Sequence, residues 1–340
     1  MIEIDGQTLE GGGQLLRTSL ALSALTGKAV RIFNIRKGRE KPGLFHQHLM
    51  AVKAVQSLCN AKVRGAKLRS EEIEFKPGPI KGGNYKFDIG TAGSTTLLLQ
   101  AFLPPACFAD DKVEVEIIGG TDNPWAPPID YFMNVMVPIF SKIGLDCKVS
   151  LIKRGFYPKG GGRIRAIINP VSMNQLNPIH LTKQGRVIEI KGISYASNHL
   201  KKAKVAERQA SSAKNQIKTV LNLKPEIEIQ YCDSLSPGSG VVIWAKTDTG
   251  AILGADSLGK RGKSAEDVGK ECGKRLIMEI KSGAPVDVYL ADDLVLWIGL
   301  VGGEIKTSKI SLHTKTNLWV CSQFLNKEFD LKDNLIKLST

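Results

Sequence analysis

The segment from Glu10 to Arg17 reads EGGGQLLR and combines a carboxylate, three consecutive glycines and an arginine. The alternating residues MIEIDG before it predict a strand, and the apolar spacing of LLRTSLALSALTG predicts a helix that ends at Gly27. Glycines at the start of a helix let an anion approach the unpaired backbone amides. Glu10 is suited to hold a divalent metal, and Arg17 is suited to reach a phosphate.

This glycine turn differs from two common phosphate-binding signatures. It has no Gly-Lys-Ser/Thr, which a Walker A loop requires, and its glycines lack the spacing of the dinucleotide-binding fingerprint. The pattern alone therefore favours a phosphate site and a tight structural corner equally.

A cluster of cations follows in IRKGREKPGLFHQHL, residues 35–49. It stands between a predicted strand and a predicted helix, where a phosphate could bind with Gln47 and His48 nearby. Such loops are often only solvated, but this one belongs to the same unit as the glycine turn, so the two interpretations are equal. The cations are Arg36, Lys37, Arg39 and Lys41.

Two later segments could contact a phosphate or a base. GTAGSTTLLLQ, residues 90–100, opens a helix with small residues, and GGTDNPWAPPIDYF, residues 119–132, has prolines that fix the backbone beside Trp125 and Tyr131. A base stacked on such a rim is worth about 1–3 kcal/mol. A proline-capped helix start with core aromatics is the alternative, and the pattern alone favours it. RGFYPKGGGRI, residues 154–164, predicts a hairpin.

The histidine with the most suggestive position is His313, in SLHTKTN, after a predicted strand and at the start of the last predicted helix. A neutral imidazole is a competent covalent nucleophile near pH 7. The chain has no Ser-His-Asp order and no HExxH motif. From the pattern alone, a helix-capping or surface role for His313 is favoured over a catalytic one.

These segments fall into a repeated order of elements. A strand, turn, helix, strand and helix, followed by shorter strands, occupy residues 2–76, and the same order returns between residues 84 and 170. A third, degenerate copy begins near Val286 with VDVYLADDLVLWIGLVGG, followed by KTSKIS and then by HTKTNLWVCSQFLNKEF. Each unit is a β-α-β-α pattern with trailing strands, which predicts three similar subdomains of an α/β (α+β) fold.

A segment with a different order of predicted strands and helices separates the second copy from the third. Residues 182–281 have their own strands and two predicted helices, and they predict an inserted small α/β domain. They carry 18 basic and 11 acidic side chains, which is half of the excess charge of the chain. An RNA-facing insert and a solvated surface are equally compatible with that charge. Residues 1–181 and 282–340 form the predicted domain of three repeats.

The composition is that of a globular protein with a large core. The chain has 340 residues, of which 42% are apolar and 24% charged, and no apolar run approaches the roughly 20 residues of a membrane span. The N-terminus is no signal peptide, and the six scattered cysteines form no CxxC pair, so we expect no membrane partner, no zinc site and a cytoplasmic location. The net charge of +14 suggests a polyanionic partner such as nucleic acid, and equally a lysine-rich surface.

Taken together, these motifs resemble those of the RNA 3′-terminal phosphate cyclases over nearly the whole chain and in the same order. The matching motifs are EGGGQLLR, RKGREKPGL with QHL, GTAGSTTLLLQ, GGTDNPWAPP, GFYPKGGG, VAER at residues 205–208, YLADD at residues 289–293, and the late histidine. The resemblance implies three repeats similar to the C-terminal domain of translation initiation factor three, with an inserted thioredoxin-like domain.

The resemblance also implies a reaction. ATP adenylylates a histidine, AMP passes to an RNA 3′-phosphate, and the neighbouring 2′-hydroxyl displaces AMP to leave a 2′,3′-cyclic phosphate. ATP and a divalent metal, Mg²⁺ or Mn²⁺, are the implied cofactors, and RNA 3′-phosphate ends are the implied partner. His313 matches the nucleophile and Glu10 the metal ligand. Arg17, Arg39 and Gln47 match the phosphate contacts, and Gln100, Pro127, Tyr131, Tyr289 and Asp292 match the nucleotide pocket, with adenine between Tyr289 and Pro127.

Two positions depart from the family pattern. Asp293 stands in the nucleotide pocket where the bacterial form YLADQ has glutamine, and a second carboxylate there could add a metal contact or weaken a hydrogen bond to the ribose. Lys315 stands two residues after His313, where an apolar residue is common. That change leaves the nucleophile in place.

Two other functions are compatible with parts of the pattern. A catalytically silent cyclase-like factor of ribosomal RNA processing would share the fold and lack the histidine, which this chain retains. An enolpyruvyl transferase has repeats of related architecture, but the YLADD segment and the late histidine have no role in it. The sequence leaves the oligomeric state and the choice of metal open.

Overall fold

The computed structural model describes residues 1–339, and within them three four-stranded sheets share one strand order. The first sheet contains β1 (Ile2–Asp5), β2 (Val30–Phe33), β4 (Ile73–Lys76) and β3 (Lys62–Arg64), in that spatial order. The second contains β5 (Gly83–Asp88), β6 (Val113–Gly119), β8 (Gly162–Asn169) and β7 (Asp146–Lys153). In both, the first two strands are parallel and the other neighbours antiparallel. The mixed α/β class predicted from the sequence is confirmed.

The third sheet corrects one prediction. Its strands are β9 (Ile179–Leu181), β14 (Gly303–Lys306), β16 (Leu335–Leu338) and β15 (Phe329–Lys332), with β9 parallel to β14. The third copy therefore begins at β9 and not near Val286, and its second strand is β14 and not KTSKIS. Residues 182–287 separate β9 from the first helix of its own unit, which hides the repeat from a sequence pattern.

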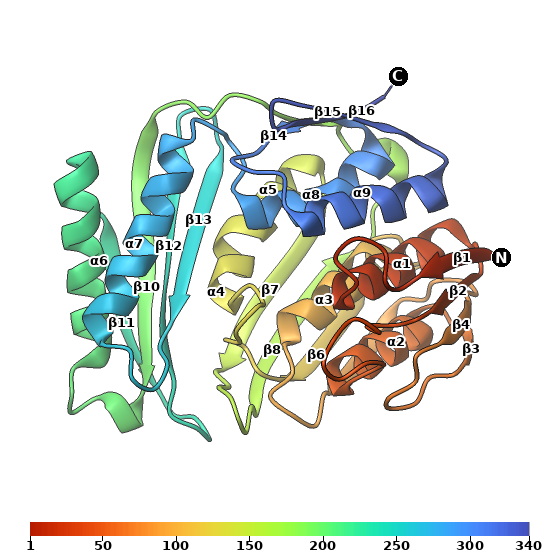
Figure 1. Cartoon of the computed structure of the whole chain (residues 1–340), viewed down its shortest axis with the longest axis horizontal. Coiled ribbons are helices and arrows are strands. Elements are labelled where there is room, and N and C mark those ends of the chain that lie inside the picture. The colour runs from red at the N-terminus through yellow and green to blue at the C-terminus, as the bar shows by residue number, and fades with distance from the viewer. Residues whose placement is uncertain (340) are drawn as a thin grey trace.

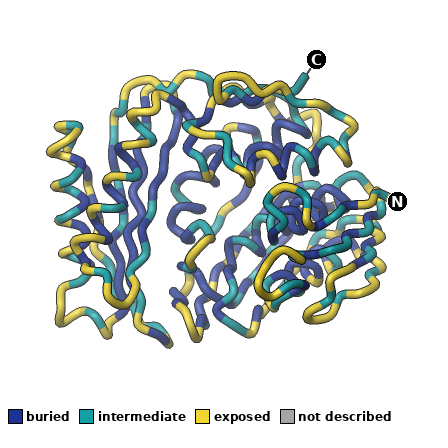
Figure 2. Tube along the Cα trace, viewed as in Figure 1, coloured by how far each residue is buried: buried dark blue, intermediate teal, exposed yellow. Residues whose placement is uncertain are grey.

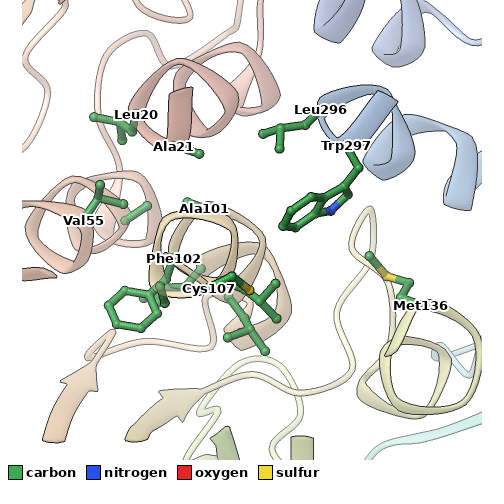
Figure 3. Packing of buried hydrophobic residues seen from close by; sticks show 14 of the residues in the cluster. Leu20, Ala21, Val55, Ala101, Phe102, Cys107, Met136, Leu296 and Trp297 are labelled. Atoms are coloured by element: carbon green, nitrogen blue, oxygen red, sulfur yellow. The ribbon is translucent and has the colours of Figure 1, made fainter. Parts of the chain in front are cut away.

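Six helical segments of the three units pack against one another between the sheets (Figure 1). They are α1 (Gly13–Thr26), α2 (His46–Leu58), α3 (Thr95–Ala106), a continuous run of α4 (Ile129–Tyr131), the π-helical η1 (Phe132–Met136) and α5 (Val137–Ile143), α8 (Val288–Val301), and α9 (Leu312–Leu325). Figure 3 shows Leu20 of α1, Ala101 and Phe102 of α3, and Trp297 of α8 in this shared core. One hydrophobic core therefore holds the three units together.

A fourth sheet has a different strand order, β11 (Glu226–Cys232), β10 (Val187–Ser197), β12 (Ser239–Thr247) and β13 (Ile252–Leu258). Helices α6 (Val205–Leu221) and α7 (Ala265–Lys281) cover its outer face, and its other face is turned toward the three units (Figure 1). Gly269 has no room for a Cβ atom against the carbonyl of Gln209, so α6 and α7 pack closely. In Figure 2 the strands of the fourth sheet are mostly dark blue, which marks buried residues, whereas α6 and α7 have exposed residues on their outer faces.

The fourth sheet is joined to the second unit by a buried ion cluster. Arg154 Nη1 lies 2.7 Å from Asp130 Oδ2 and 3.4 Å from Asp122 Oδ2, and its guanidinium lies 3.8 Å from the ring centre of Tyr195 on β10. Arg154 Nη2 also donates to Gln230 Oε1 of β11 at 3.1 Å. The side chain of Arg154 is only 3% exposed. One buried cation therefore links the second sheet to the fourth.

Short helical turns complete the described structure: η2 (Met173–Gln175) and η3 (Asn198–Leu200). Within residues 1–339, no helix combines the length and the apolar character needed to cross a membrane.

Candidate active site

The glycine turn lies between β1 and α1 and is fixed against the last helix. Leu9 and Gly11 have φ angles of 55° and 62°, a left-handed conformation that glycine adopts without strain. A Cβ atom on Gly12 would overlap the carboxylate of Glu10. The backbone N–H of Glu10 donates to Thr316 Oγ1 of α9 at 3.2 Å. The turn therefore folds back and directs Glu10 toward the start of α9.

Three predicted site residues converge there. Arg39 forms an ion pair with the carboxylate of Glu10, and Oε2 of Glu10 lies 3.9 Å from His313 Nδ1. Oε2 is buried and has no hydrogen-bond partner among residues 1–339. The side chain of Glu10 is 11% exposed, whereas those of Arg39 and His313 are nearly half exposed. A carboxylate oxygen without a partner thus faces an accessible imidazole.

His313 lies in the first turn of α9, and Ser311 caps that helix. Ser311 Oγ accepts from the backbone N–H of Thr314 at 2.9 Å. Both Ser311 Oγ and Thr314 Oγ1 lie 2.6 Å from Oδ1 of Asp292. Since a helix N-terminus favours negative charge, a phosphate bound at His313 would be stabilised by α9.

Arg17 extends the site into the interior. Its Nη2 donates to Gln14 Oε1 at 2.5 Å, and burial lowers the pKa of Arg17 to about 10, which leaves it charged at neutral pH. A Cβ atom on Gly13 would come within 2.5 Å of His48 Nε2 and 3.0 Å of Arg17 Nη1. Gly13, which has no side chain, therefore leaves room for His48 and Arg17 beside the turn.

His48 has no predicted role from the sequence beyond its position near the basic loop. Its Nδ1 accepts the backbone N–H of Phe45 at 3.2 Å. Burial, together with the charges of Arg17 and Arg36, lowers the pKa of His48 to about 3. A neutral, buried imidazole therefore supports the arginine side of the site, while His313 is the accessible one.

Asp292 and Asp293 lie on α8, beside Arg17 of α1. This part of α8 is deep between α1, α3 and α9. Gln100 Nε2 donates to Asp293 Oδ2 at 3.0 Å, and burial together with the charge of Asp292 raises the pKa of Asp293 well above its ordinary value. With Arg17 and Gln100, the two aspartates line a cavity of about 30 Å³. Asp293 lines this cavity, and its Oδ2 is held by Gln100.

The residues predicted for the nucleotide pocket form a second group. Tyr289 is 46% exposed, and its ring meets that of Tyr131 edge to face at 6.5 Å between centres. Tyr131 is only 1% exposed, so it supports Tyr289 from inside. Pro127 is fixed by its carbonyl, which accepts from Thr96 Oγ1 at 2.7 Å.

Asp287 organises this group and was missed from the sequence. Its Oδ1 accepts from Tyr131 Oη at 2.6 Å and from the backbone N–H groups of Tyr289 and Leu290 at 3.0 Å each. Its Oδ2 accepts from Gly254 N of β13 at 2.9 Å. An Asp immediately before a predicted helix is a usable N-cap signal, but its link to the fourth sheet has no local signal.

Gln47 stands apart from the Glu10 group. Its Oε1 accepts the backbone N–H of Ser94 at 3.2 Å, which joins the start of α2 to the loop before α3. Of the predicted site residues, Glu10, Arg39 and His313 thus form one group, Arg17, Gln100, Asp292 and Asp293 a second, and Pro127, Tyr131 and Tyr289 a third.

The donor set fits a divalent cation held jointly with phosphate. Within residues 1–339, no three His, Cys, Asp or Glu side chains gather as a metal cluster, so the chain would supply the single carboxylate of Glu10. Mg²⁺ is commonly bound by one or two carboxylates, with phosphates and water completing its coordination. The unpartnered Oε2 of Glu10 suits that arrangement.

A glycine turn, two arginines and an accessible histidine at a helix N-terminus suit an enzyme that transfers nucleotidyl or phosphoryl groups. Residues 8–331 match the family model for RNA 3′-terminal phosphate cyclase. The RNA 3′-terminal phosphate cyclase of Pyrococcus furiosus is 47% identical over 98% of this chain and 95% of its own length. The one of Archaeoglobus fulgidus is 44% identical over 99% of each chain. The chain belongs to the RNA 3′-terminal phosphate cyclase family.

Proposed function

We propose that this chain uses ATP to convert an RNA 3′-terminal phosphate to a 2′,3′-cyclic phosphate through an adenylylated His313. The observation that carries the proposal is the accessible imidazole of His313 at the start of α9, with Nδ1 3.9 Å from the unpartnered Oε2 of Glu10. Family membership supports the overall reaction. The roles of individual residues rest on the geometry.

In the first step, His313 attacks the α-phosphorus of ATP. We assign Nε2 as the reacting atom, because Nδ1 faces the carboxylate of Glu10. The N–P bond forms while the bond from the α-phosphorus to the bridging oxygen breaks, and pyrophosphate leaves. Arg39 and Arg17, together with the amides at the start of α9, stabilise the charge on the phosphoryl oxygens.

Two further transfers complete the reaction. An oxygen of the RNA 3′-phosphate attacks the AMP phosphorus, the N–P bond breaks, and an RNA-(3′)pp(5′)-A end forms. The 2′-hydroxyl then attacks the 3′-phosphorus, loses its proton, and expels AMP. The requirement for that hydroxyl makes RNA the substrate.

The other predicted residues take supporting roles. Tyr289 and Pro127 hold the adenine between them, and Tyr131 supports Tyr289. Asp292 uses Oδ1 to fix Ser311 and Thr314, and so orients the turn that carries His313. Gln100 donates a hydrogen bond to Asp293, and this pair lies beneath the nucleotide. Gln47 contacts phosphate at the loop before α3.

Glu10 Oε2 would hold the divalent cation, Mg²⁺ or Mn²⁺, and a cation there would supply charge neutralisation for the phosphates. Arg39, which is now paired with Glu10, would then be free to pair with a phosphate. Both interactions use groups that already lie beside His313.

The architecture follows the same proposal. We assign residues 1–181 and 282–340 to a catalytic domain of three subdomains similar to the C-terminal domain of translation initiation factor three, and residues 182–281 to a thioredoxin-like insert. The recurring strand order and the separate apolar cluster of the fourth sheet support this division. We place the enzyme in the cytoplasm, in keeping with six cysteines that all occur as free thiols within the described residues.

The test is labelling with ATP that carries radioactivity in its α-phosphate, followed by denaturation. The parent protein should retain acid-labile AMP, and His313→Ala should retain none. His46→Ala, which changes an exposed histidine on α2, is the matched control and should label like the parent. If His313→Ala also labels like the parent, another residue is the nucleophile.

The RNA end separates cyclisation from the processing-factor alternative. An RNA that ends in 2′-deoxyribose 3′-phosphate should accept AMP and stop there, and one that ends in a 3′-hydroxyl should accept none. A protein that binds structured ribosomal RNA and cyclises nothing would support the silent factor instead.

A further inference from the structure

Three loops of the second unit lie side by side at one end of its sheet. They are the loop before α3 (residues 89–94), the loop after β6 (residues 120–128) and the turn between β7 and β8 (residues 154–161). The side chain of Asn123 donates to the carbonyl of Ala92, and Thr121 N donates to Gly155 O at 2.9 Å. Asp122 also forms an isolated parallel bridge with Phe156.

Two aromatic side chains project from these loops into solvent. Trp125 is 98% exposed, and Tyr157 is 72% exposed. By contrast, Trp244 and Trp297 are almost fully buried. Trp125 also has a φ angle of 61°, a left-handed conformation that costs about 1 kcal/mol or more for a bulky residue. An exposed tryptophan held in a strained conformation has no packing role that would account for it.

The same edge continues onto the fourth sheet. Lys159 N donates to Ser236 Oγ at 3.2 Å, and Asn198 Nδ2 donates to Asp233 Oδ1 at 2.6 Å. The turn that follows Asn198 carries three exposed lysines, Lys201, Lys202 and Lys204. Figure 1 shows these loops along its lower edge, from the second unit to the start of α6.

The edge is also continuous with the candidate active site. The loop before α3 is bonded to Gln47 through Ser94 N, and Thr96 on α3 holds the carbonyl of Pro127, two residues after Trp125. These bonds connect the edge to Gln47 and Pro127, two of the residues predicted for the phosphate contacts and the nucleotide pocket.

We propose that this edge binds the single-stranded RNA that precedes the reacting 3′ end. Trp125 and Tyr157 stack on unpaired bases, and Lys159, Lys201, Lys202 and Lys204 pair with phosphates farther along the strand. Stacking on aromatic rings accepts any base but needs it unpaired, which selects single strands over duplexes. The inference rests on the proposed function. It assigns part of the positive charge of residues 182–281 to binding RNA phosphates.

The first test measures the affinity of a fluorescent, 3′-phosphorylated oligonucleotide by anisotropy. Trp125→Ala and Tyr157→Ala should each weaken binding roughly 5- to 100-fold, the equivalent of one lost stacking contact. Trp125→Phe should restore most of the affinity. The control is Met173→Ala, because Met173 is a large apolar residue, 46% exposed, beyond the far end of β8, and the affinity of this variant should equal that of the parent.

A readout without RNA separates this surface from the nucleotide pocket. Self-adenylylation by Trp125→Ala should show the ATP dependence of the parent. If the KM for ATP rises instead and the RNA affinity stays the same, Trp125 belongs to the nucleotide pocket and the proposal is wrong.

The second test concerns the lysines. Replacing Lys201, Lys202 and Lys204 together with Ala should weaken the binding of long RNAs more than that of short ones. It should also lower the slope of log affinity against log salt concentration by about 2, since each phosphate contact contributes about 0.7. The control replaces Lys218, Lys224 and Lys281, which are exposed at the opposite end of α6 and α7. Equal effects of both triple variants would mean that only net charge matters and would overturn the path.

Failure of this inference is distinguishable from failure of the proposed function. A parent that neither labels with AMP nor cyclises RNA contradicts the function. A parent that does both, with RNA affinity unchanged in Trp125→Ala, Tyr157→Ala and the Lys201, Lys202 and Lys204 triple variant, contradicts only the RNA path.

Discussion

Arg39 and Arg154 each face carboxylates, but their surroundings differ in how far the charges are enclosed. Arg154, Asp122 and Asp130 have side chains no more than 3% exposed, and Arg154 lies between both carboxylates. Arg39 is 47% exposed beside Glu10, and His313 on the other side of Glu10 is 49% exposed. Buried Oε2 of Glu10 has no hydrogen-bond partner in residues 1–339.

The difference separates a cluster that joins parts of the fold from one that is available to a substrate. The Arg154 cluster bonds the second unit to Tyr195 and Gln230 of the fourth sheet, so its charges are used within the protein. The Glu10 cluster includes the accessible imidazole of His313 and a carboxylate oxygen of Glu10 that can still accept a hydrogen bond or bind a cation. Loss of a residue from the first should reduce stability, and loss from the second should reduce activity.

The largest expected effect is on activity, in Glu10→Ala. Adenylylation and cyclisation should both fall on the order of 100-fold or more, since a lost group that stabilises phosphoryl charge costs about 3 kcal/mol. Added Mg²⁺ or Mn²⁺ should restore part of the rate. The measurement is the rate of AMP labelling and of cyclic phosphate formation against metal concentration.

The control is Glu3→Ala, which removes an exposed carboxylate paired with Arg31 in the same unit. It should leave both rates and the melting temperature unchanged. Rates of Glu10→Ala equal to those of the parent at limiting metal would show that Glu10 is only structural.

The elements around Glu10 could be predicted from the sequence because their signals are local. The alternation in MIEIDG, the glycine run and the left-handed Gly27 at the end of α1 are all within a few residues of the features they define. The beginning of the third unit could not be predicted in the same way. β9 pairs with β14, which follows more than 120 residues later, and its three residues give too short a pattern to recognise.

The site residues likewise divide into those that local motifs predict and contacts that only the tertiary structure reveals. The motifs identified Glu10, Arg39 and His313 separately, but the folding of the glycine turn onto Thr316 that brings them together depends on tertiary packing. The same limit applies to Asp287, whose bonds reach Tyr131 and Gly254 in two other parts of the chain. Local propensity gives the elements, and the pairing of distant side chains comes only from the packed core.

The second prediction compares the two arginines directly by their effect on stability. Arg154→Met should lower the free energy of unfolding by about 3–5 kcal/mol, because it leaves Asp122 and Asp130 buried without their cation. Arg39→Met should lower it by less than about 1 kcal/mol, because the side chain of Arg39 is nearly half exposed in its ion pair with Glu10. Chemical denaturation of both variants and the parent measures the difference.

Activity should change in the opposite order. Arg39→Met should slow AMP labelling strongly, and the folded fraction of Arg154→Met should label at the rate of the parent. Equal losses of stability in the two variants would remove the distinction between the clusters.

The smallest expected effect concerns His48, the buried counterpart of His313. The folded pKa of His48 is about 3, well below the unfolded value of about 6.5. Between these values the unfolded chain binds a proton that the folded chain does not, so this contribution to stability is complete above pH 6.5 and is lost as the pH falls toward 3. At up to about 1.4 kcal/mol per pH unit, it amounts to about 1–2 kcal/mol between pH 6.5 and pH 5.

His48→Gln should remove this dependence, because its amide oxygen can still accept from Phe45 N and does not titrate. The free energy of unfolding of the parent should therefore fall more steeply than that of the variant between pH 6.5 and pH 5. His46→Gln, which changes the exposed histidine two residues earlier on α2, should keep the slope of the parent. If all three slopes agree, His48 takes up its proton in the folded state, and the glycine turn does not enclose it as the contact with Gly13 implies.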